Sequence, residues 1–208
     1  NQMQLTIVPS QFTKKTFEDT AEKHGKTITT NLQVISEYFD DTIYNSNNVT
    51  TKVPALETII EKEAFLMCGH WLSGQLGEDR KNALYNHTKI KAMVSFTKAE
   101  GFGRPLLEFA TTGKPIIVPH YSGQADFLKK EFICALPGTM TDIHESAAND
   151  FLLKESQWFT VDYGYAGKML VDVLKNYKNW KQLATRQRYF VNSKFTETAI
   201  AKRYDEIL

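Results

Sequence analysis

The sequence predicts an α/β fold in which helices flank a parallel sheet. Short apolar segments alternate with stretches whose apolar residues recur at helical spacing. This alternation is typical of parallel strands joined by helices. A polar loop that contains glycine follows each of the apolar segments ending at Cys68, Phe96 and Val118. Ligands of parallel sheets bind at the carboxyl ends of the strands, so we expect these three loops to carry the function.

The first predicted elements are a strand, a helix and a second strand. Residues 5–8 form an apolar strand, and Ser10 stands two residues later where a helix N-cap is favoured. We expect the helix to continue to about Lys23. Gly25 ends it, because glycine readily adopts the left-handed conformation that closes a helix. Residues 32–35 form the next predicted strand.

The following part of the chain is more polar. Asparagine, serine and threonine dominate residues 45–51, which predicts a loop or linker. A short amphipathic helix over residues 55–63 and an apolar strand over residues 64–68 are expected next. The charged residues 78–82, with glycines before them, predict a polar turn.

In the second half, residues 91–96 predict a short buried strand. A helix is expected from Pro105, a residue favoured in a first helical turn, to about Thr112, with Gly113 closing it. Residues 115–118 predict another buried strand. The remaining expectations are helices over 124–130, 164–177, 180–192 and 196 to the C-terminus, a strand over 132–135, and irregular chain over 138–157.

Composition and charge argue against several classes of partner. The 208 residues include 25 Lys and Arg against 24 Asp and Glu, so no overall field attracts nucleic acid or an anionic membrane. No apolar stretch approaches the roughly 18–20 residues of a membrane span, and no signal peptide is evident. We therefore expect a cytoplasmic protein, in which Cys68 and Cys134 are buried free thiols rather than a disulfide. The chain begins with Asn1 instead of Met, so we expect a processed chain or a piece of a longer one.

The most informative motif is a glycine turn between two glutamates, Glu100 and Glu108. Gly101 and Gly103 permit a tight turn and the close approach of a ligand to the backbone. Free N–H groups at the start of the following helix favour an anion. This combination suits a ligand that has both an anionic centre and hydroxyl groups, such as a sugar nucleotide.

Four ordered segments resemble one known family. Residues 91–128 resemble the donor-binding domain of the retaining GT-B glycosyltransferases of the family 4-like group (glycosyl transferases group 1), whose hallmark is Glu-x7-Glu, matched here by Glu100 and Glu108. The next strand and the small-residue loop of that family are matched by residues 113–118 and by Ser122-Gly123. The other similar segments are residues 8–12, residues 65–82 and the tail from Trp158.

The resemblance implies a Rossmann-like sheet and a division of the chain into three parts. Residues 1–45 would form the junction between two domains, 46–157 the donor-binding domain, and 158–208 terminal helices that pack back towards an N-terminal GT-B domain. That acceptor-binding domain is absent from this sequence. The interval at Asn82-Ala83 is also shorter than in the family, which indicates either an internal deletion or missing residues.

The resemblance also implies an activity and roles for residues. The family transfers a hexose from a nucleoside-diphosphate sugar with retention of the anomeric configuration, without a metal or a cofactor. Expected partners are a UDP-, GDP- or ADP-sugar, an unknown acceptor and the absent domain. Glu100 would bind sugar hydroxyls and Arg80 the diphosphate, as the catalytic pair. The expected donor-binding residues are Glu108 on the ribose hydroxyls, Gly101, Phe102, Gly103, Leu106, Lys81, Ser122 and Gly123.

Each role has an ordinary structural alternative. Glu108 could be an exposed helix residue, Glu100 could cap the following helix, and Arg80 with Lys81 could belong to a solvated turn. His70 and His120 follow predicted strands, where a structural role is the commoner one. The alternative functions are a non-catalytic sugar-nucleotide-binding remnant and an unrelated Rossmann-like module. The second alternative is weak, because the sequence has neither the dinucleotide fingerprint nor a P-loop.

Overall fold

The computed structural model describes residues 4–47, 77–149 and 152–207. Its helices are α1 (Gln11–Lys23), α3 (Glu78–Asn86), α4 (Arg104–Ala110), α5 (Tyr163–Lys175), α6 (Tyr177–Lys194) and α7 (Glu197–Asp205). Its strands are β1 (Leu5–Val8), β2 (Asn31–Val34), β3 (Met93–Val94), β4 (Ile116–Pro119), β5 (Cys134–Leu136), β6 (Gly138–Asp142) and β7 (Gln157–Val161). The strand predicted over 64–68 and the helix predicted over 55–63 lie outside the described residues.

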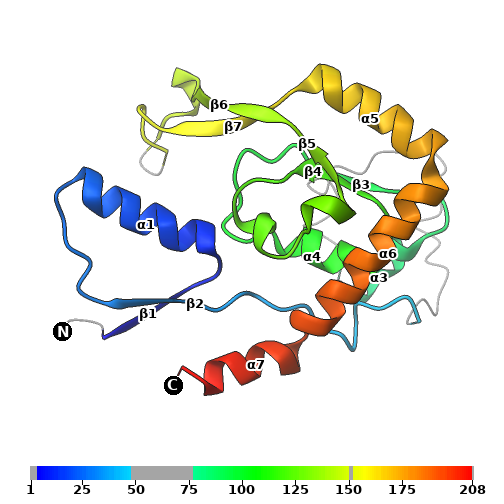
Figure 1. The fold of residues 1–208 in the computed structure, drawn as a ribbon, viewed down its shortest axis with the longest axis horizontal. Coiled ribbons are helices and arrows are strands. Elements are labelled where there is room, and N and C mark those ends of the chain that lie inside the picture. The colour runs from blue at the N-terminus through cyan, green and yellow to red at the C-terminus, as the bar shows by residue number, and fades with distance from the viewer. Residues whose placement is uncertain (1–3, 48–76, 150–151, 208) are drawn as a thin grey trace.

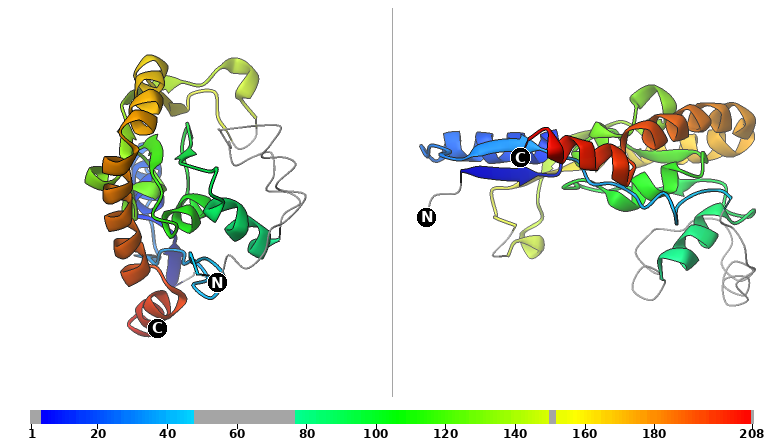
Figure 2. Two further views of the ribbon diagram at one scale, coloured as in Figure 1. Left: turned by 90° about the vertical axis from the view of Figure 1, so that its right-hand side faces the viewer. Right: turned by 90° about the horizontal axis from the view of Figure 1, so that it is seen from below.

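The predicted α/β architecture is confirmed, with the described strands distributed over three sheets. β1 pairs with β2 in parallel, and β3, β4 and β5 form a parallel sheet in that order. β6 and β7 form an antiparallel pair. Figure 1 shows β1, β2 and α1 on the side of the molecule opposite α5 and α6. Figure 2 shows α5, α6 and α7 following one another along one side.

The central sheet is covered on both faces. Successive residues of a strand point to opposite faces, so alternate residues of β4 belong to different cores. Ile116 and Val118 of β4 belong to a core that includes Leu107 of α4 and Val191 of α6. Ile117, between them, belongs to a second core, which includes Ala166 and Val173 of α5. The sheet is therefore enclosed by α4 and α6 on one face and by α5 on the other.

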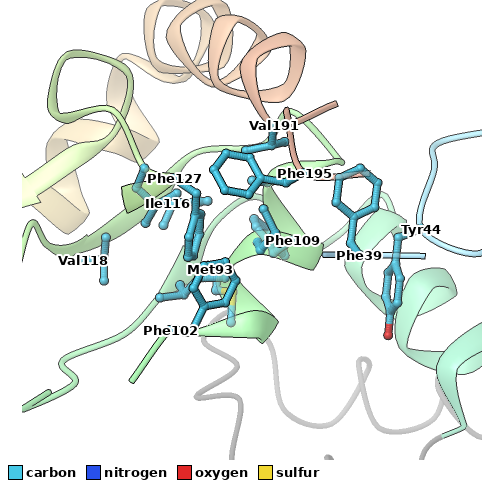
Figure 3. Packing of buried hydrophobic residues seen from close by; sticks show 14 of the residues in the cluster. Phe39, Tyr44, Met93, Phe102, Phe109, Ile116, Val118, Phe127, Val191 and Phe195 are labelled. Carbon is cyan, nitrogen blue, oxygen red and sulfur yellow. The ribbon is translucent and has the colours of Figure 1, made fainter. Parts of the chain in front are cut away.

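Aromatic rings dominate the first of these cores, as Figure 3 shows. The rings of Phe102 and Phe127 lie 4.9 Å apart between centroids, and Phe195 is 6.0 Å from Phe127. Phe39, from the segment after β2, is 1% exposed in the same core. Its N–H donates to the carbonyl of Phe195 at 3.1 Å. The core thus joins the segment after β2, the central sheet and the last helices.

The first predicted elements are confirmed closely. The Ser10 hydroxyl accepts a hydrogen bond from the Thr13 N–H and caps α1, and Gly25 has a φ of +59° just beyond the helix. β2 begins one residue earlier than predicted. These elements were predictable because their signals are local.

The predicted polar turn at residues 78–82 is wrong, since these residues begin α3. Asn82 and Ala83 lie in the middle of this helix. Tertiary contacts hold this polar helix in place. Leu84 is 1% exposed, and the Asn82 amide donates to the carbonyl of Asn45 at 3.2 Å.

Two further expectations differ from the structure. The helix predicted over 124–130 is replaced by short 3-10 turns at Gly123–Asp126 and Lys130–Phe132. The stretch predicted to be irregular contains β6 and the start of β7. β6 is mostly polar and partly exposed, so it lacks the apolar run by which a buried strand is recognised in a sequence. No helix among the described residues is long and apolar enough to cross a membrane.

Candidate functional site

Two of the predicted loops meet at the carboxyl ends of β3 and β4. The Glu100 N–H donates to the Ser122 hydroxyl at 2.8 Å, and the Gly123 N–H donates to the Glu100 carbonyl at 2.9 Å. The Ser122 hydroxyl in turn donates to the Oε1 of Gln124. The Gln124 side chain is fully buried, and its Nε2 donates to the Pro119 carbonyl. Ser122 and Gly123 therefore fix the backbone of Glu100.

This contact between the loops demands unusual backbone geometry. Ser122 has a φ of +64°, a conformation that costs a non-glycine residue about 1–3 kcal/mol. A Cβ atom on Gly123 would lie only 2.2 Å from the Gly101 carbonyl oxygen. Strain of this kind often occurs at functional sites, where the surrounding structure must maintain it.

The Glu100 side chain is half-buried beside the glycine turn. Its Oε1 accepts a hydrogen bond from the Thr97 hydroxyl at 2.9 Å. The N-cap of α4 is Gly103, with a φ of +96° and no side-chain cap. The capping alternative for Glu100 is therefore wrong, and its carboxylate is held at the loop by Thr97.

The other residues of the turn contribute side chains to the core and backbone groups to hydrogen bonds. Phe102 and Leu106 are each 3% exposed, with their side chains in the first core. The Leu106 N–H donates to the Gly103 carbonyl at 3.0 Å. The Gly101 carbonyl accepts hydrogen bonds from the hydroxyls of Ser10 and Thr13, at 2.6 and 3.1 Å. Phe102 and Leu106 thus anchor the turn, and their side chains do not line it.

Glu108 is buried, at 3% exposed, so the alternative of an exposed helix residue is wrong. The Nε of Arg104, one turn earlier on α4, donates to its Oε1 at 3.2 Å. Burial raises the pKa of the Glu108 carboxyl, while Lys81 acts to lower it, Glu78 to raise it and Arg104 to lower it. Glu78, Lys81, Arg104 and Glu108 form what we call the charged cluster.

Helix α3 supplies the other half of the charged cluster. Lys81 pairs with Glu78 at 2.5 Å, and the buried hydroxyl of Tyr44 donates to the same carboxylate. Arg80 is exposed on α3, and no hydrogen bond or ion pair joins it to another described residue. Lys81 is therefore within electrostatic reach of Glu108, whereas Arg80 lies on the surface.

A hollow of about 440 Å³ lies between the N-terminal strands, α4 and α7. Its polar walls come from Ser36, Glu37, Tyr38, Arg104 and Tyr204, and apolar residues of β1 and α7 complete it. Sequence reasoning missed Arg104, Glu78 and Tyr44. The spacing of Arg104 and Glu108, four residues apart on one helix, was a signal that could have identified this pair.

The remaining candidates have structural roles or lie outside the described residues. The Nε2 of His120 is 2.9 Å from the carbonyl of Leu128, which fixes the ring against the chain. His70, with Cys68 and Gly69, lies in the part that the structure does not describe. Cys134 is a free, buried thiol whose pKa burial raises to about 12. Within the described ranges, no three His, Cys, Asp or Glu side chains are grouped as a metal site would require.

Comparison with solved structures shows that the chain has a GT-B glycosyltransferase-like fold. It is similar to the sucrose-phosphate synthase tll1590 of Thermosynechococcus elongatus, at a TM-score of 0.58 and 12% identity, over 97% of this chain and 56% of that one. It is also similar to Anabaena Alr3699/HepE, solved in complex with UDP and glucose. The TM-score is 0.57 at 12% identity, over 98% of this chain and 62% of that one. A third similar structure is a glycosyltransferase from Rickettsia africae ESF-5, at a TM-score of 0.53 and 14% identity, over 98% of this chain and 62% of that one.

The matched part of each solved structure is 56 to 62% of its length, so this chain spans little more than half of those proteins. No protein-family model matches the sequence, and no curated protein matches it significantly. At 12 to 14% identity, the likeness establishes the fold, and the chemistry has to be argued from the site itself.

Proposed function

We propose that this chain is the donor-binding half of a retaining glycosyltransferase, which transfers a hexose from a nucleoside-diphosphate sugar. The observation that carries the proposal is the arrangement of Glu100 and Glu108 around the glycine turn, at the carboxyl end of β3. This is the edge of a parallel sheet at which ligands bind. The likeness to glycosyltransferases, one of them solved with UDP and glucose, supports the same ligand class.

In this proposal the two glutamates bind hydroxyl groups at opposite ends of the donor. Glu100, held at the loop by Thr97 and by the backbone contacts of Ser122 and Gly123, would accept hydrogen bonds from the sugar. Glu108 would accept hydrogen bonds from the ribose. A carboxylate has about four acceptor positions, so Glu108 can bind hydroxyls while it keeps Arg104.

The transfer of a sugar requires the departure of a diphosphate while positive charge develops on the sugar ring. Fixed charges and dipoles stabilise such a transition state most effectively when they are already in place. The strained, buried contact between the two loops provides this rigidity for Glu100. The acceptor and the second half of the active cleft would belong to a further domain.

A non-catalytic sugar-nucleotide-binding protein is the second candidate. The observation that favours it is the position of Arg80, the expected catalytic cation, which is exposed and lies outside the charged cluster. Such a protein would bind the donor and leave it intact.

Calorimetric titration of the chain with UDP, GDP and ADP tests the proposal. We expect one of the three to bind, and the variant Glu108→Ala to bind it about 10- to 100-fold more weakly, because it loses charge-assisted hydrogen bonds to hydroxyls. Glu22→Ala, on the exposed face of α1, is the matched control and should bind like the wild type. The absence of binding to all three nucleotides would refute the proposal.

A second measurement separates an enzyme from a binding protein. The chain is incubated with the sugar nucleotide whose nucleotide it binds, and the release of nucleoside diphosphate is followed over time. Because activity requires the second domain in this proposal, the assay is repeated with that domain supplied. Release above the background in that mixture supports transfer, whereas tight binding without release supports the second candidate.

A further inference from the structure

We propose that Arg104 is the cation that binds the diphosphate of the donor in this chain, and that Glu108 holds its guanidinium in position. The inference rests on the proposed function, since it names the phosphate-binding residue of the same site. It moves this role from Arg80 and Lys81 on α3 to a residue on α4, next to the glutamate assigned to the ribose.

The two cations of α3 are poorly placed for the role. Arg80 is exposed and has no described partner that would fix its long side chain. Binding of a phosphate there would lose the full conformational entropy of the free arginine side chain. Lys81 is already paired with Glu78 at 2.5 Å, with 21% of its side chain exposed. Its ammonium is therefore held against Glu78 and is less accessible to a ligand than the guanidinium of Arg104, whose side chain is 48% exposed.

Arg104 combines order with access. Its side chain is 48% exposed, and its Nε donates to the buried Oε1 of Glu108 at 3.2 Å. No other hydrogen bond or ion pair of Arg104 is formed with the described residues, which leaves both terminal nitrogens to bind a ligand. A guanidinium presents five N–H donors in a planar fork that matches phosphate oxygens, so one edge can hold Glu108 while another binds phosphate.

The hollow beside Arg104 carries polar groups that suit a nucleotide. Among the described residues that line the 440 Å³ hollow, Arg104 is the one lysine or arginine. Ser36 and Glu37 supply hydrogen-bonding groups, and Tyr38 and Tyr204 are more than a third exposed on its walls. A ribose whose C2′ and C3′ hydroxyls bind Glu108 carries its diphosphate on C5′, two carbons from C3′, and the contact between Glu108 and Arg104 keeps the two binding groups close together.

The carboxylates near Arg104 repel a phosphate. Asp40, Glu78 and Glu108 are all within electrostatic reach of its guanidinium. They stabilise the cation and oppose a phosphate, so a bound diphosphate must make direct hydrogen bonds to Arg104. The loss of the guanidinium should therefore affect binding through the phosphates and leave the nucleoside contacts intact.

The test compares a nucleoside diphosphate with its own nucleoside. The wild type, Arg104→Gln and Arg80→Gln, which tests the residue first expected to bind the diphosphate, are titrated calorimetrically with UDP, GDP or ADP, whichever the wild type binds, and with uridine, guanosine or adenosine. We expect Arg104→Gln to bind the diphosphate about 10- to 100-fold more weakly and the nucleoside with unchanged affinity. Arg80→Gln should match the wild type for both ligands.

Several results would overturn the assignment. If Arg104→Gln binds the diphosphate like the wild type, or if Arg80→Gln shows the loss instead, Arg104 is not the phosphate-binding residue, and the proposed function still stands. An equal loss for diphosphate and nucleoside would show that Arg104 acts on the ribose site or the fold. If the wild type binds no nucleotide, both proposals fail together.

Arg104→Lys covers the case in which Arg104→Gln does not fold because Glu108 loses its partner. Lysine retains the positive charge beside Glu108 and lacks the planar fork. We expect a melting temperature close to that of the wild type. The affinity for the nucleoside diphosphate should fall, and the affinity for the nucleoside should stay unchanged. An affinity equal to that of the wild type would contradict the requirement for a guanidinium.

Discussion

Gly123 is the residue at which the two loops of the site come closest. The atoms nearest to its missing side chain are backbone atoms of Gly101 and Phe102, within 2.2 to 2.6 Å of where a Cβ would stand. Backbone cannot rotate away as a flexible side chain does. The spacing of Ser122 and Gly123 in the sequence identifies a small-residue loop, and only the structure shows that the small size serves to hold Glu100.

We predict that Gly123→Ala destabilises the chain by about 1–3 kcal/mol or more, because the added methyl overlaps the opposite loop. Nucleotide binding should fall as well, since Glu100 is displaced. Urea unfolding and calorimetric titration measure the two effects. Gly101→Ala is the matched control for stability: no atom lies within 4 Å of its added Cβ, and its effect should stay within about 0.5–1 kcal/mol. Equal effects of the two substitutions would contradict the prediction.

The roles of the two glutamates show where residue-level reasoning reached its limit. Their types and spacing predicted acceptors for hydroxyl groups, and this role stays a prediction. The burial of Glu108 depends on contacts between α3 and α4 that no local pattern encodes, whereas its pair with Arg104 follows from their four-residue spacing on α4.

At the scale of elements, α3 differs most from expectation. Its sequence is rich in charge, and its N-cap, Gly77, makes no side-chain hydrogen bond. Its C-terminal end is instead stabilised from a distance by Lys114, whose Nζ donates to the carbonyls of Tyr85 and His87, both at 2.7 Å. A helix that depends on such a contact cannot be recognised from its own residues.

We predict that Lys114→Met lowers the free energy of unfolding by about 1–3 kcal/mol, because two helix-end carbonyls lose a buried donor. The variant should also change the pH dependence. Burial, with Lys181 and Lys91 nearby, lowers the pKa of Lys114 to about 7, from 10.5 for an ordinary lysine. Between these values the unfolded chain binds a proton that the folded one has released, so this lysine makes stability rise with pH from about 7 towards 10.5.

Urea unfolding at several pH values from neutral to alkaline measures this contribution. The rise with pH should be smaller in Lys114→Met than in the wild type and should persist in Lys89→Met, which changes an exposed lysine close by. If Lys114→Met and the wild type follow the same pH profile, the buried lysine does not contribute in this way.

At the scale of the whole molecule, the N-terminal unit is docked onto the site through the start of α1. Ser10, which is fully buried, both caps α1 and donates to the Gly101 carbonyl. The N–H of Gln11 donates to the carboxylate of Asp126 at 2.8 Å. The glycine turn is thus fixed from one side by Ser122 and from the other by α1.

We predict that Ser10→Ala destabilises the chain by about 1–2 kcal/mol through the lost cap and also weakens nucleotide binding, because the Gly101 carbonyl loses the shorter of its two hydrogen bonds from α1 and its N-cap. Thr196→Ala is the matched control. Thr196 caps α7 in the same way, through the Ala199 N–H at 3.2 Å, and should lower stability without changing the affinity. Thermal melting and titration of both variants check the prediction, and a loss of affinity in Thr196→Ala equal to that in Ser10→Ala would contradict it.

Local signals in the sequence determined the α/β class, most of the strands of the two parallel sheets, the ends of α1 and α4, and the two glutamates around the glycine turn. These depend on periodicity, caps and glycines within a few residues. The tertiary structure alone decided the helical state of residues 78–86, the pairing of β6 with β7 and the burial of Glu108. The physical reason is that these features draw their stability from residues far away in the chain. Asn45 and Lys114, for example, form their hydrogen bonds to α3 only when the core brings them together.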